Sequence, residues 1–190
     1  MKGFILTSAL ALIERYMDPE VVEKLNNQFQ LESSGVYESN SDYCDKEFTR
    51  LFDTLAEISG MKPDKMYKAI GFFVFAESRA ASPEWVETAD SAFSALIQHD
   101  AIVIESLEKA FPGYVGSVYE CQREGDNRLY IDFYSTYLPT KVAEGFMLAT
   151  TLHFDEAISI ELLPAEHSDE ETEFRQRFLL KRKAPVTGVA

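Results

Sequence analysis

The chain contains few side chains that could ligate a metal ion or act as a nucleophile. Its histidines are His99, His153 and His167, and its cysteines are Cys44 and Cys121. The cysteines are far apart in the sequence and neither belongs to a CxxC pair, so we expect two reduced thiols rather than a disulfide or a zinc site. We expect His99, on a long predicted helix, to be an ordinary, partly exposed side chain; ligation of a bound metal is the alternative.

Motifs of the common enzyme classes are absent from the sequence. Residues 113–116 (GYVG) do not form a phosphate-binding loop, and the sequence has no GxSxG, HExxH or defensible Cys-His arrangement. Asp90, Asp100 and Glu105 fall on a predicted helix, where acidic side chains are typical of a solvated surface. We therefore expect that the chain is not an enzyme.

The acidic composition limits the classes of partner. Lys and Arg number 18 against 32 Asp and Glu, which gives a net charge of -14. Nucleic acids and anionic membranes are bound by clustered cations, so neither is expected, and a protein or a small ligand fits better. The apolar start at residues 1–6 is too short to span a bilayer. We expect a cytoplasmic protein.

Helical periodicity dominates the first two thirds of the chain. Pro19 is typical of the first turn of a helix, and Gly60 is typical of the position after the last turn. The segment from Gly71 to Phe75 is apolar almost all round its helix, which predicts burial on several sides. Helices are expected over residues 3–16, from residue 19, from residue 48 to Gly60, from residue 63, over residues 88–111 and over residues 140–153.

The spacing of apolar residues changes to every second position after Pro112-Gly113. This alternation is typical of strands, and the polar turn at residues 123–127 predicts a hairpin. Strands are expected over residues 114–121, 129–134, 158–163 and 173–181.

A chain of 190 residues is long enough for one core. We therefore predict a single α+β domain over residues 1–182. Helices make up residues 1–60, further helices and the sheet make up residues 61–182, and residues 183–190 form a loose tail.

Several short motifs occur together in a characteristic order. They are Met1-Lys2-Gly3, Tyr43, residues 69–73 (AIGFF), Phe111-Pro112-Gly113, Ser135, Ala143-Glu144-Gly145 and His153-Phe154. On these residues the chain resembles heme nitric oxide/oxygen-binding (H-NOX) domains, a fold shared with the heme domain of soluble guanylate cyclase. The resemblance implies an N-terminal helical subdomain, followed by a long helix and a mixed subdomain with a small antiparallel sheet.

The iron ligand of the family is absent from its usual position. H-NOX domains ligate heme iron through a histidine on the long helix. Counting back from Phe111 places that position at Ile104, or at Val103 if one gap is allowed. Iron needs a donor with a lone pair, and an aliphatic side chain has none.

The residues that bind the heme propionates are also changed. The family's Tyr-x-Ser-x-Arg run falls on residues 133–137, where Phe133 and Tyr137 replace the tyrosine and the arginine and Ser135 remains. Partly buried carboxylates without a cation cost on the order of several kcal/mol. We therefore expect no cofactor, with heme, the family cofactor, as the alternative.

Three functions follow from the resemblance. The first is a sensory or regulatory module that does not bind heme in the family manner. The second is a heme-dependent NO or O2 sensor in which His99 ligates the iron, and the third is a protein-interaction adaptor without a ligand. Family members act on a histidine kinase or a cyclic-di-nucleotide enzyme, so such a protein partner is expected.

The aromatic residues of the segment 71–75 have two interpretations. They either fill the former cofactor cavity or line an apolar pocket for another small ligand. The residues expected at this pocket are Ile5, Ile70, Phe73, Phe75, Val103, Ile104, Phe133, Ser135, Tyr137 and Leu148.

Overall fold

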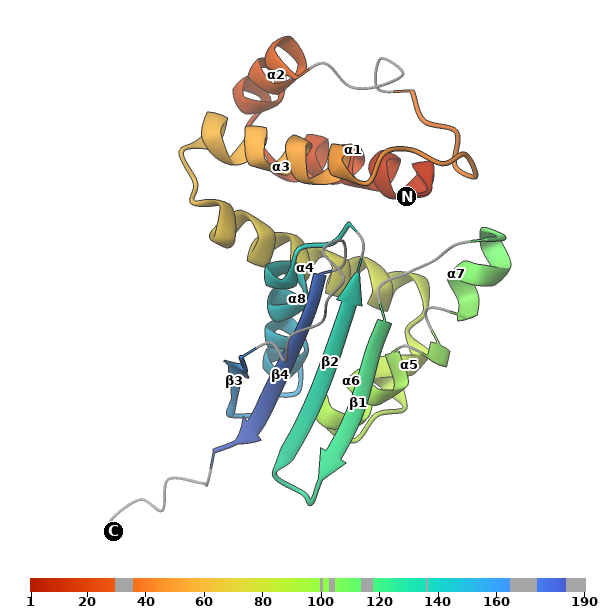
Figure 1. Cartoon of the computed structure of the whole chain (residues 1–190), viewed down its shortest axis with the longest axis vertical. Helices are drawn as coiled ribbons and strands as arrows, with labels where there is room; N and C mark the ends of the chain where they lie inside the picture. Colours follow the sequence, from red (N-terminus) through yellow and green to blue (C-terminus); the bar gives the residue numbers. More distant parts are fainter. Residues whose placement is uncertain are drawn as a thin grey trace.

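The computed structural model of the 190-residue chain describes residues 1–29, 36–99, 101–102, 105–113, 118–135, 137–164 and 174–183. These residues form eight helices and one small sheet (Figure 1). The helices are α1 (Gly3–Tyr16), α2 (Pro19–Gln28), α3 (Lys46–Ser59), α4 (Pro63–Ala81), α5 (Glu84–Glu87), α6 (Ala92–His99), α7 (Glu105–Ala110) and α8 (Thr140–His153). The strands are β1 (Val118–Glu124), β2 (Arg128–Ser135), β3 (Ile158–Leu162) and β4 (Phe174–Arg182).

The helix ends follow the local chemistry of the sequence. The Asp18 carboxylate accepts a hydrogen bond from the Glu20 backbone N–H at 2.9 Å and caps α2, which begins at Pro19. Gly60 ends α3 with a φ of 67°, a left-handed conformation that glycine adopts without strain. The predicted helices over residues 3–16 and 140–153 are confirmed to the residue.

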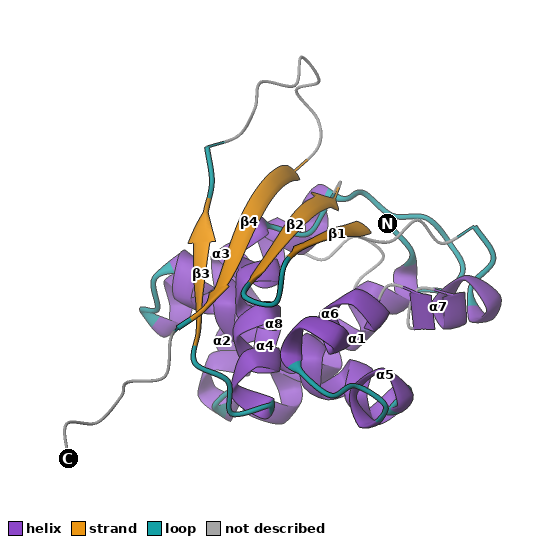
Figure 2. Ribbon diagram, turned by 90° about the horizontal axis from the view of Figure 1, so that it is seen from below, coloured by secondary structure: helices purple, strands orange, loops and turns teal. Residues whose placement is uncertain are grey.

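The four strands form an antiparallel sheet in the order β1-β2-β4-β3. Figure 2 shows α4, α6 and α8 on one side of this sheet. Along β2, Leu129, Ile131 and Phe133 are buried and alternate with half-buried residues, so every second side chain faces the helices. The predicted α+β class and the predicted hairpin are confirmed.

Two groups of buried apolar residues make up the core. The N-terminal cluster comes from α1 to α4 and includes Leu6, Ile13, Leu51, Phe52, Leu55, Met66 and Ile70. The sheet cluster comes from α4, α5, α6, α8 and the strands, and it includes Phe75, Trp85, Leu96, Phe133, Phe146 and Phe178. Val74 and Leu138 pack against both clusters, so the two cores meet along α4 and the segment before α8.

Helices α4 and α8 cross at glycines. A Cβ atom added at Gly71 would overlap the Val142 carbonyl of α8, and one added at Gly145 would overlap the Lys68 carbonyl of α4. Because neither Gly71 nor Gly145 has a side chain, the backbones of α4 and α8 can touch at this crossing. This contact fixes α8 between α4 and the sheet.

The region of the predicted long helix differs from expectation. Residues 89–91 are not helical, α6 begins at Ala92, Ala101 and Ile102 have π-helical geometry, and α7 begins at Glu105. A π turn adds one residue to a helical turn and rotates the residues on either side relative to each other. An ideal periodicity of 3.6 residues per turn, counted through this region, therefore does not predict which side chains point toward the core.

Burial of α4 is also less complete than predicted. Phe72, within the segment expected to be buried on several sides, is 37% exposed.

None of the helices in the described part of the chain is both long enough and apolar enough to cross a membrane.

Candidate functional site

A cavity of about 390 Å³ lies between the N-terminal cluster and the sheet cluster, and it opens to solvent beside exposed residues such as Arg15, Tyr16 and Glu77. Its walls come from α1, α3, α4, α6, α7, α8, β1 and the segment before α8. The lining residues are Phe4, Ile5, Ser8, Ala9, Ala11, Leu12, Arg15, Tyr16, Phe48, Phe52, Ile70, Val74, Glu77, Ser78, His99, Leu107, Tyr119, Tyr137, Leu138 and Phe146. Most of these side chains are aliphatic or aromatic, which is typical of a small-molecule pocket.

Helix α1 forms one wall because successive turns present small or apolar residues to the cavity. Ile5, Ala9 and Leu12 are spaced at i, i+4 and i+7 and therefore lie on one face. Next to them, the Phe4 ring stacks on Phe111, which follows α7, with the ring centroids 3.9 Å apart. The N-terminal helix and α7 are thus joined at the edge of the cavity.

His99 contributes a buried imidazole to the cavity wall. Its exposed fraction is 6%, so the expectation of a partly exposed side chain is wrong. Ala92, Leu96 and His99 lie at i, i+4 and i+7 on one face of α6, and all three are buried. Burial lowers the pKa of His99 to about 4, and the imidazole is therefore neutral near pH 7.

Aromatic rings surround His99. Trp85 lies edge-on at 4.9 Å between ring centroids and Phe146 at 4.6 Å, with Tyr119 at 6.0 Å. Neither ring nitrogen of His99 has a hydrogen-bond partner among the described residues. The cavity wall thus contains a buried imidazole whose two ring nitrogens, one a donor and one an acceptor, make no hydrogen bond with the described residues.

The residues expected at a pocket fall into three groups. Ile5, Ile70 and Tyr137 line the cavity, and His99 joins them. Val103 and Ile104, the candidate positions for the family's iron ligand, lie outside the described residues.

The remaining expected residues are placed elsewhere in the fold. Phe133 and Phe75 are buried in the sheet cluster, and Phe73 is half-buried against the Tyr16 ring at 4.5 Å. Leu148 is half-buried on α8 and is not part of the described cavity wall. Two of these candidates, Phe75 and Phe133, therefore belong to the core.

Ser135 acts at the end of β2. Its hydroxyl oxygen accepts hydrogen bonds from the backbone N–H groups of Leu138, at 2.9 Å, and Tyr137, at 3.4 Å. These bonds turn the chain from the strand toward α8. They also bring Tyr137, which is 6% exposed, and Leu138 to the cavity.

Charge at the cavity is limited to its rim. In the described part of the lining, Arg15 and Glu77 are the charged side chains, and they face each other at 3.9 Å with more than half of each side chain exposed. Such an exposed pair contributes little to stability. The two charges offset each other, so the rim carries no net charge.

Several lining residues were not predicted from the sequence. Phe4, Leu12, Phe48, Tyr119 and Phe146 come from four different elements, α1, α3, β1 and α8, so no local motif joins them. The spacing of Ala92, Leu96 and His99 was a usable signal for the burial of His99, because it places the imidazole on the same helix face as two apolar residues.

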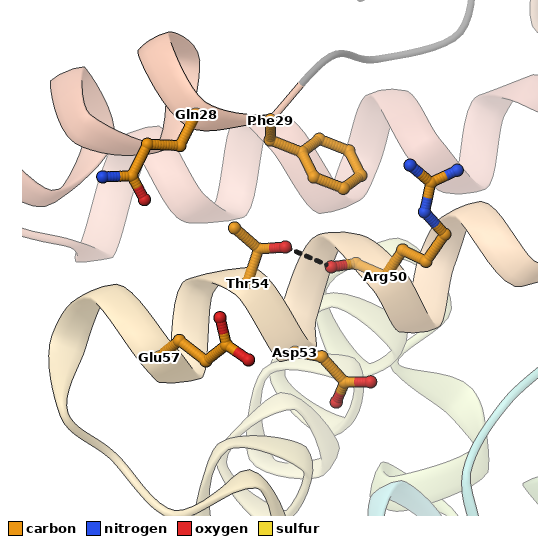
Figure 3. A pocket seen from close by; sticks show the side chains of 6 residues that line it. All are labelled: Gln28, Phe29, Arg50, Asp53, Thr54 and Glu57. Carbon is orange, nitrogen blue, oxygen red and sulfur yellow. Dashed lines mark hydrogen bonds between the residues drawn. The ribbon is translucent and has the colours of Figure 1, made fainter.

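A second hollow of about 410 Å³ opens between α2 and α3 (Figure 3). It is lined by Gln28, Phe29, Arg50, Asp53, Thr54 and Glu57. Two of its polar side chains have partners within the protein: the Tyr67 hydroxyl donates to Asp53 at 2.7 Å, and the Arg50 guanidinium lies over the Phe29 ring at 5.6 Å. Its lining holds one aromatic ring, so the cavity between the two clusters, with its mainly apolar lining, is the stronger candidate for a small-molecule site.

Metal ligands do not gather elsewhere in the described residues, which contain no group of three or more His, Cys, Asp or Glu side chains suited to a metal ion. Cys44 and Cys121 are both free, as predicted.

Solved structures of H-NOX proteins superpose over nearly the whole chain. The IWP-051-bound H-NOX from Shewanella woodyi, in the Fe(II)CO ligation state, is 26% identical with a TM-score of 0.74, and the alignment covers 100% of this chain and 97% of that one. The Fe(II) unliganded H-NOX protein from K. algicida is 23% identical with a TM-score of 0.78, with 100% of both chains covered. The H-NOX protein from S. oneidensis in the Fe(II)NO ligation state is 18% identical with a TM-score of 0.77, and 97% of this chain and 100% of that one are covered.

A comparison with curated proteins found no match. The model of the Haem-NO-binding (HNOB) family matches residues 2–162, which is most of the chain. The cavity between a helical cluster and a sheet cluster, the α+β fold and this match lead to one conclusion: the chain belongs to the Haem-NO-binding, or H-NOX, family of heme-based gas-sensor domains.

Proposed function

We propose that this H-NOX domain is a sensory or regulatory module whose cavity binds an uncharged, mainly apolar small molecule instead of a heme held in the family manner. The observation that carries the proposal is the position of the cavity between the two clusters. A ligand there contacts both clusters at once. Its binding therefore favours one relative placement of the clusters, provided that its affinity for the two placements differs.

The size of the cavity supports a bound ligand. Its lining is mainly aliphatic and aromatic, and 390 Å³ lies within the range of small-molecule sites. An apolar ligand would remove this lining from water, which is favourable in proportion to the apolar area covered. The cavity thus favours a ligand-binding module over an adaptor with a filled core.

The residues around the cavity fit a heme held in the family manner poorly. A heme carries two carboxylates, which need cations when they are partly buried. Within the described lining, Arg15 is the only cationic side chain, and it faces Glu77. At the family's propionate positions Tyr137 offers no positive charge and Phe133 offers no hydroxyl. An uncharged ligand avoids this cost.

One observation favours a second candidate, a heme-dependent sensor with unusual ligation. His99 lines the cavity, its imidazole is neutral, and its nitrogens have no partner among the described residues. A neutral imidazole is a common iron ligand in heme proteins. In this candidate His99 would hold the iron, and the heme would supply the gas-binding chemistry.

We expect the domain to pass its signal to a partner protein. H-NOX domains act in the family through kinases or cyclases, and by resemblance we propose a histidine kinase or a cyclic-di-nucleotide enzyme as the partner here. The net charge of -14 is consistent with a protein partner and unfavourable for nucleic acid.

The experiment that tests the proposal starts from protein expressed with added heme. We expect a purified protein without a Soret band, and an apolar compound identified by mass spectrometry of an organic extract. A Soret band that shifts with NO and is lost in His99→Leu would establish the second candidate instead. A preparation without heme and without any extracted compound, whose cavity also fails to bind an added neutral fluorophore, would refute ligand binding.

A further inference from the structure

Unused hydrogen-bonding groups are concentrated beside the cavity. Both nitrogens of His99 and the indole nitrogen of Trp85 are buried without a partner in the described part of the chain, and the two rings are 4.9 Å apart. Buried polar side chains in folded proteins nearly always have a hydrogen-bond partner, so such groups at a cavity point to a missing one. Of the two, His99 lines the cavity.

In the described part of the chain, no hydrogen bond joins His99 to the rings packed on it. Phe146 has no hydrogen-bonding atom, and the rings of Trp85 and Phe146 both meet the imidazole edge-on. The terminal torsion of a histidine is broad, so the ring can turn a nitrogen toward the cavity without leaving its place. A molecule in the cavity is then the natural partner.

We propose that His99 is the hydrogen-bonding anchor of the cavity, and that its ligand is an uncharged, ring-containing molecule carrying a hydroxyl group. This inference rests on the proposed function and names the class of ligand. A neutral imidazole accepts a hydrogen bond from a hydroxyl at one nitrogen. The hydroxyl thereby replaces the partner that the described residues do not provide.

The walls of the cavity define the rest of the ligand. The rings of Phe4, Phe48, Phe52, Tyr119 and Phe146 line it, and aromatic rings pack well against other rings. The rim pair of Arg15 and Glu77 has no net charge to attract an ion. A charged ligand would therefore lose its hydration without compensation.

The test compares two neutral probes that differ in one group, naphthol and methylnaphthalene. Each is titrated against the full chain carrying the neutral fluorophore N-phenylnaphthylamine, and the displacement gives a Kd. In the wild type we expect naphthol to bind about tenfold more tightly than methylnaphthalene, because one neutral hydrogen bond contributes about that factor. In His99→Leu the two probes should bind equally.

Matched variants assign the effect to the site. His153→Leu removes an exposed imidazole outside the cavity and should keep the tenfold preference. Leu12→Trp fills the cavity from a half-buried position and should abolish binding of both probes and of the fluorophore. If His99→Leu does not fold, His99→Gln replaces it, and a preference retained there and lost in His99→Ala supports the anchor.

Two results would overturn the inference, and they differ in meaning. Equal binding of the two probes to the wild type, or a preference that survives in His99→Leu, refutes the anchor and leaves an apolar cavity that binds ligands. Failure of the fluorophore and both probes to bind the folded wild type refutes the proposed function together with the anchor.

Discussion

Replacing His99 by leucine should make the ligand-free protein less sensitive to acid. The pKa of His99 is about 4 in the folded protein, against 6.5 for an unperturbed histidine, and burial is the cause. Because the folded pKa is the lower one, the unfolded chain takes up the proton first as the pH falls. The wild type therefore loses stability from about pH 6.5 down to about pH 4, and this contribution is constant above pH 6.5.

The magnitude follows from the shift. A difference of about 2.5 pKa units corresponds to about 3 kcal/mol at 1.36 kcal/mol per unit. The free energy of unfolding of the wild type should thus fall by about 3 kcal/mol more than that of His99→Leu between pH 7 and pH 4. At pH 7 the variant should be at least as stable, because removing buried polar atoms without partners relieves about 1 to 3 kcal/mol.

Urea unfolding followed by circular dichroism, at half-unit steps of pH, measures both quantities. Carboxylates contribute equally to the two proteins, so the difference between the curves isolates His99. His153→Leu serves as the control, because it removes an exposed imidazole outside the cavity and leaves His99 in place, so the fall in stability due to His99 should remain. Parallel curves for the wild type and His99→Leu would show that the imidazole is not buried as described.

Three further substitutions test the scaffold. Gly145→Ala should lower the free energy of unfolding by about 3 kcal/mol in urea titrations, because its Cβ would overlap the Lys68 carbonyl. Ser135→Ala should cost about 1 to 3 kcal/mol in the same assay, because it leaves buried backbone N–H groups without their acceptor. Phe4→Ala removes the stack on Phe111 at the cavity edge, so the release rate of N-phenylnaphthylamine in stopped flow should rise about tenfold; an unchanged rate would place the entry path elsewhere.

Local chemistry made most of the fold predictable from the sequence. Pro19, Gly60 and the change of apolar spacing after Gly113 mark element boundaries by mechanisms that act over a few residues. The region from Thr88 to Phe111 was less predictable, because its breaks depend on tertiary packing. A non-helical segment and π-helical geometry are not encoded by a single Gly or Pro in that stretch.

The site was predictable only in part for a related reason. Ile5, Ile70 and Tyr137 were expected at the pocket through the resemblance and do line the cavity. His99 was expected to be partly exposed, yet it shares the buried face of α6 with Ala92 and Leu96. The π-helical geometry at Ala101 and Ile102 means that its facing cannot be counted from residues further along the chain.

The path of α4 through both cores restricts how the two clusters can move. Its first half, with Met66 and Ile70, belongs to the N-terminal cluster, and its second half, with Phe75, belongs to the sheet cluster. Helix α4 has 19 residues and is about 28 Å long. While this helix stays intact, the two clusters cannot separate by a hinge motion. The remaining freedom is torsion about the α4 axis and sliding of α1 over α4. Under the proposed function, ligand binding in the cavity would therefore rotate the N-terminal helices about the α4 axis.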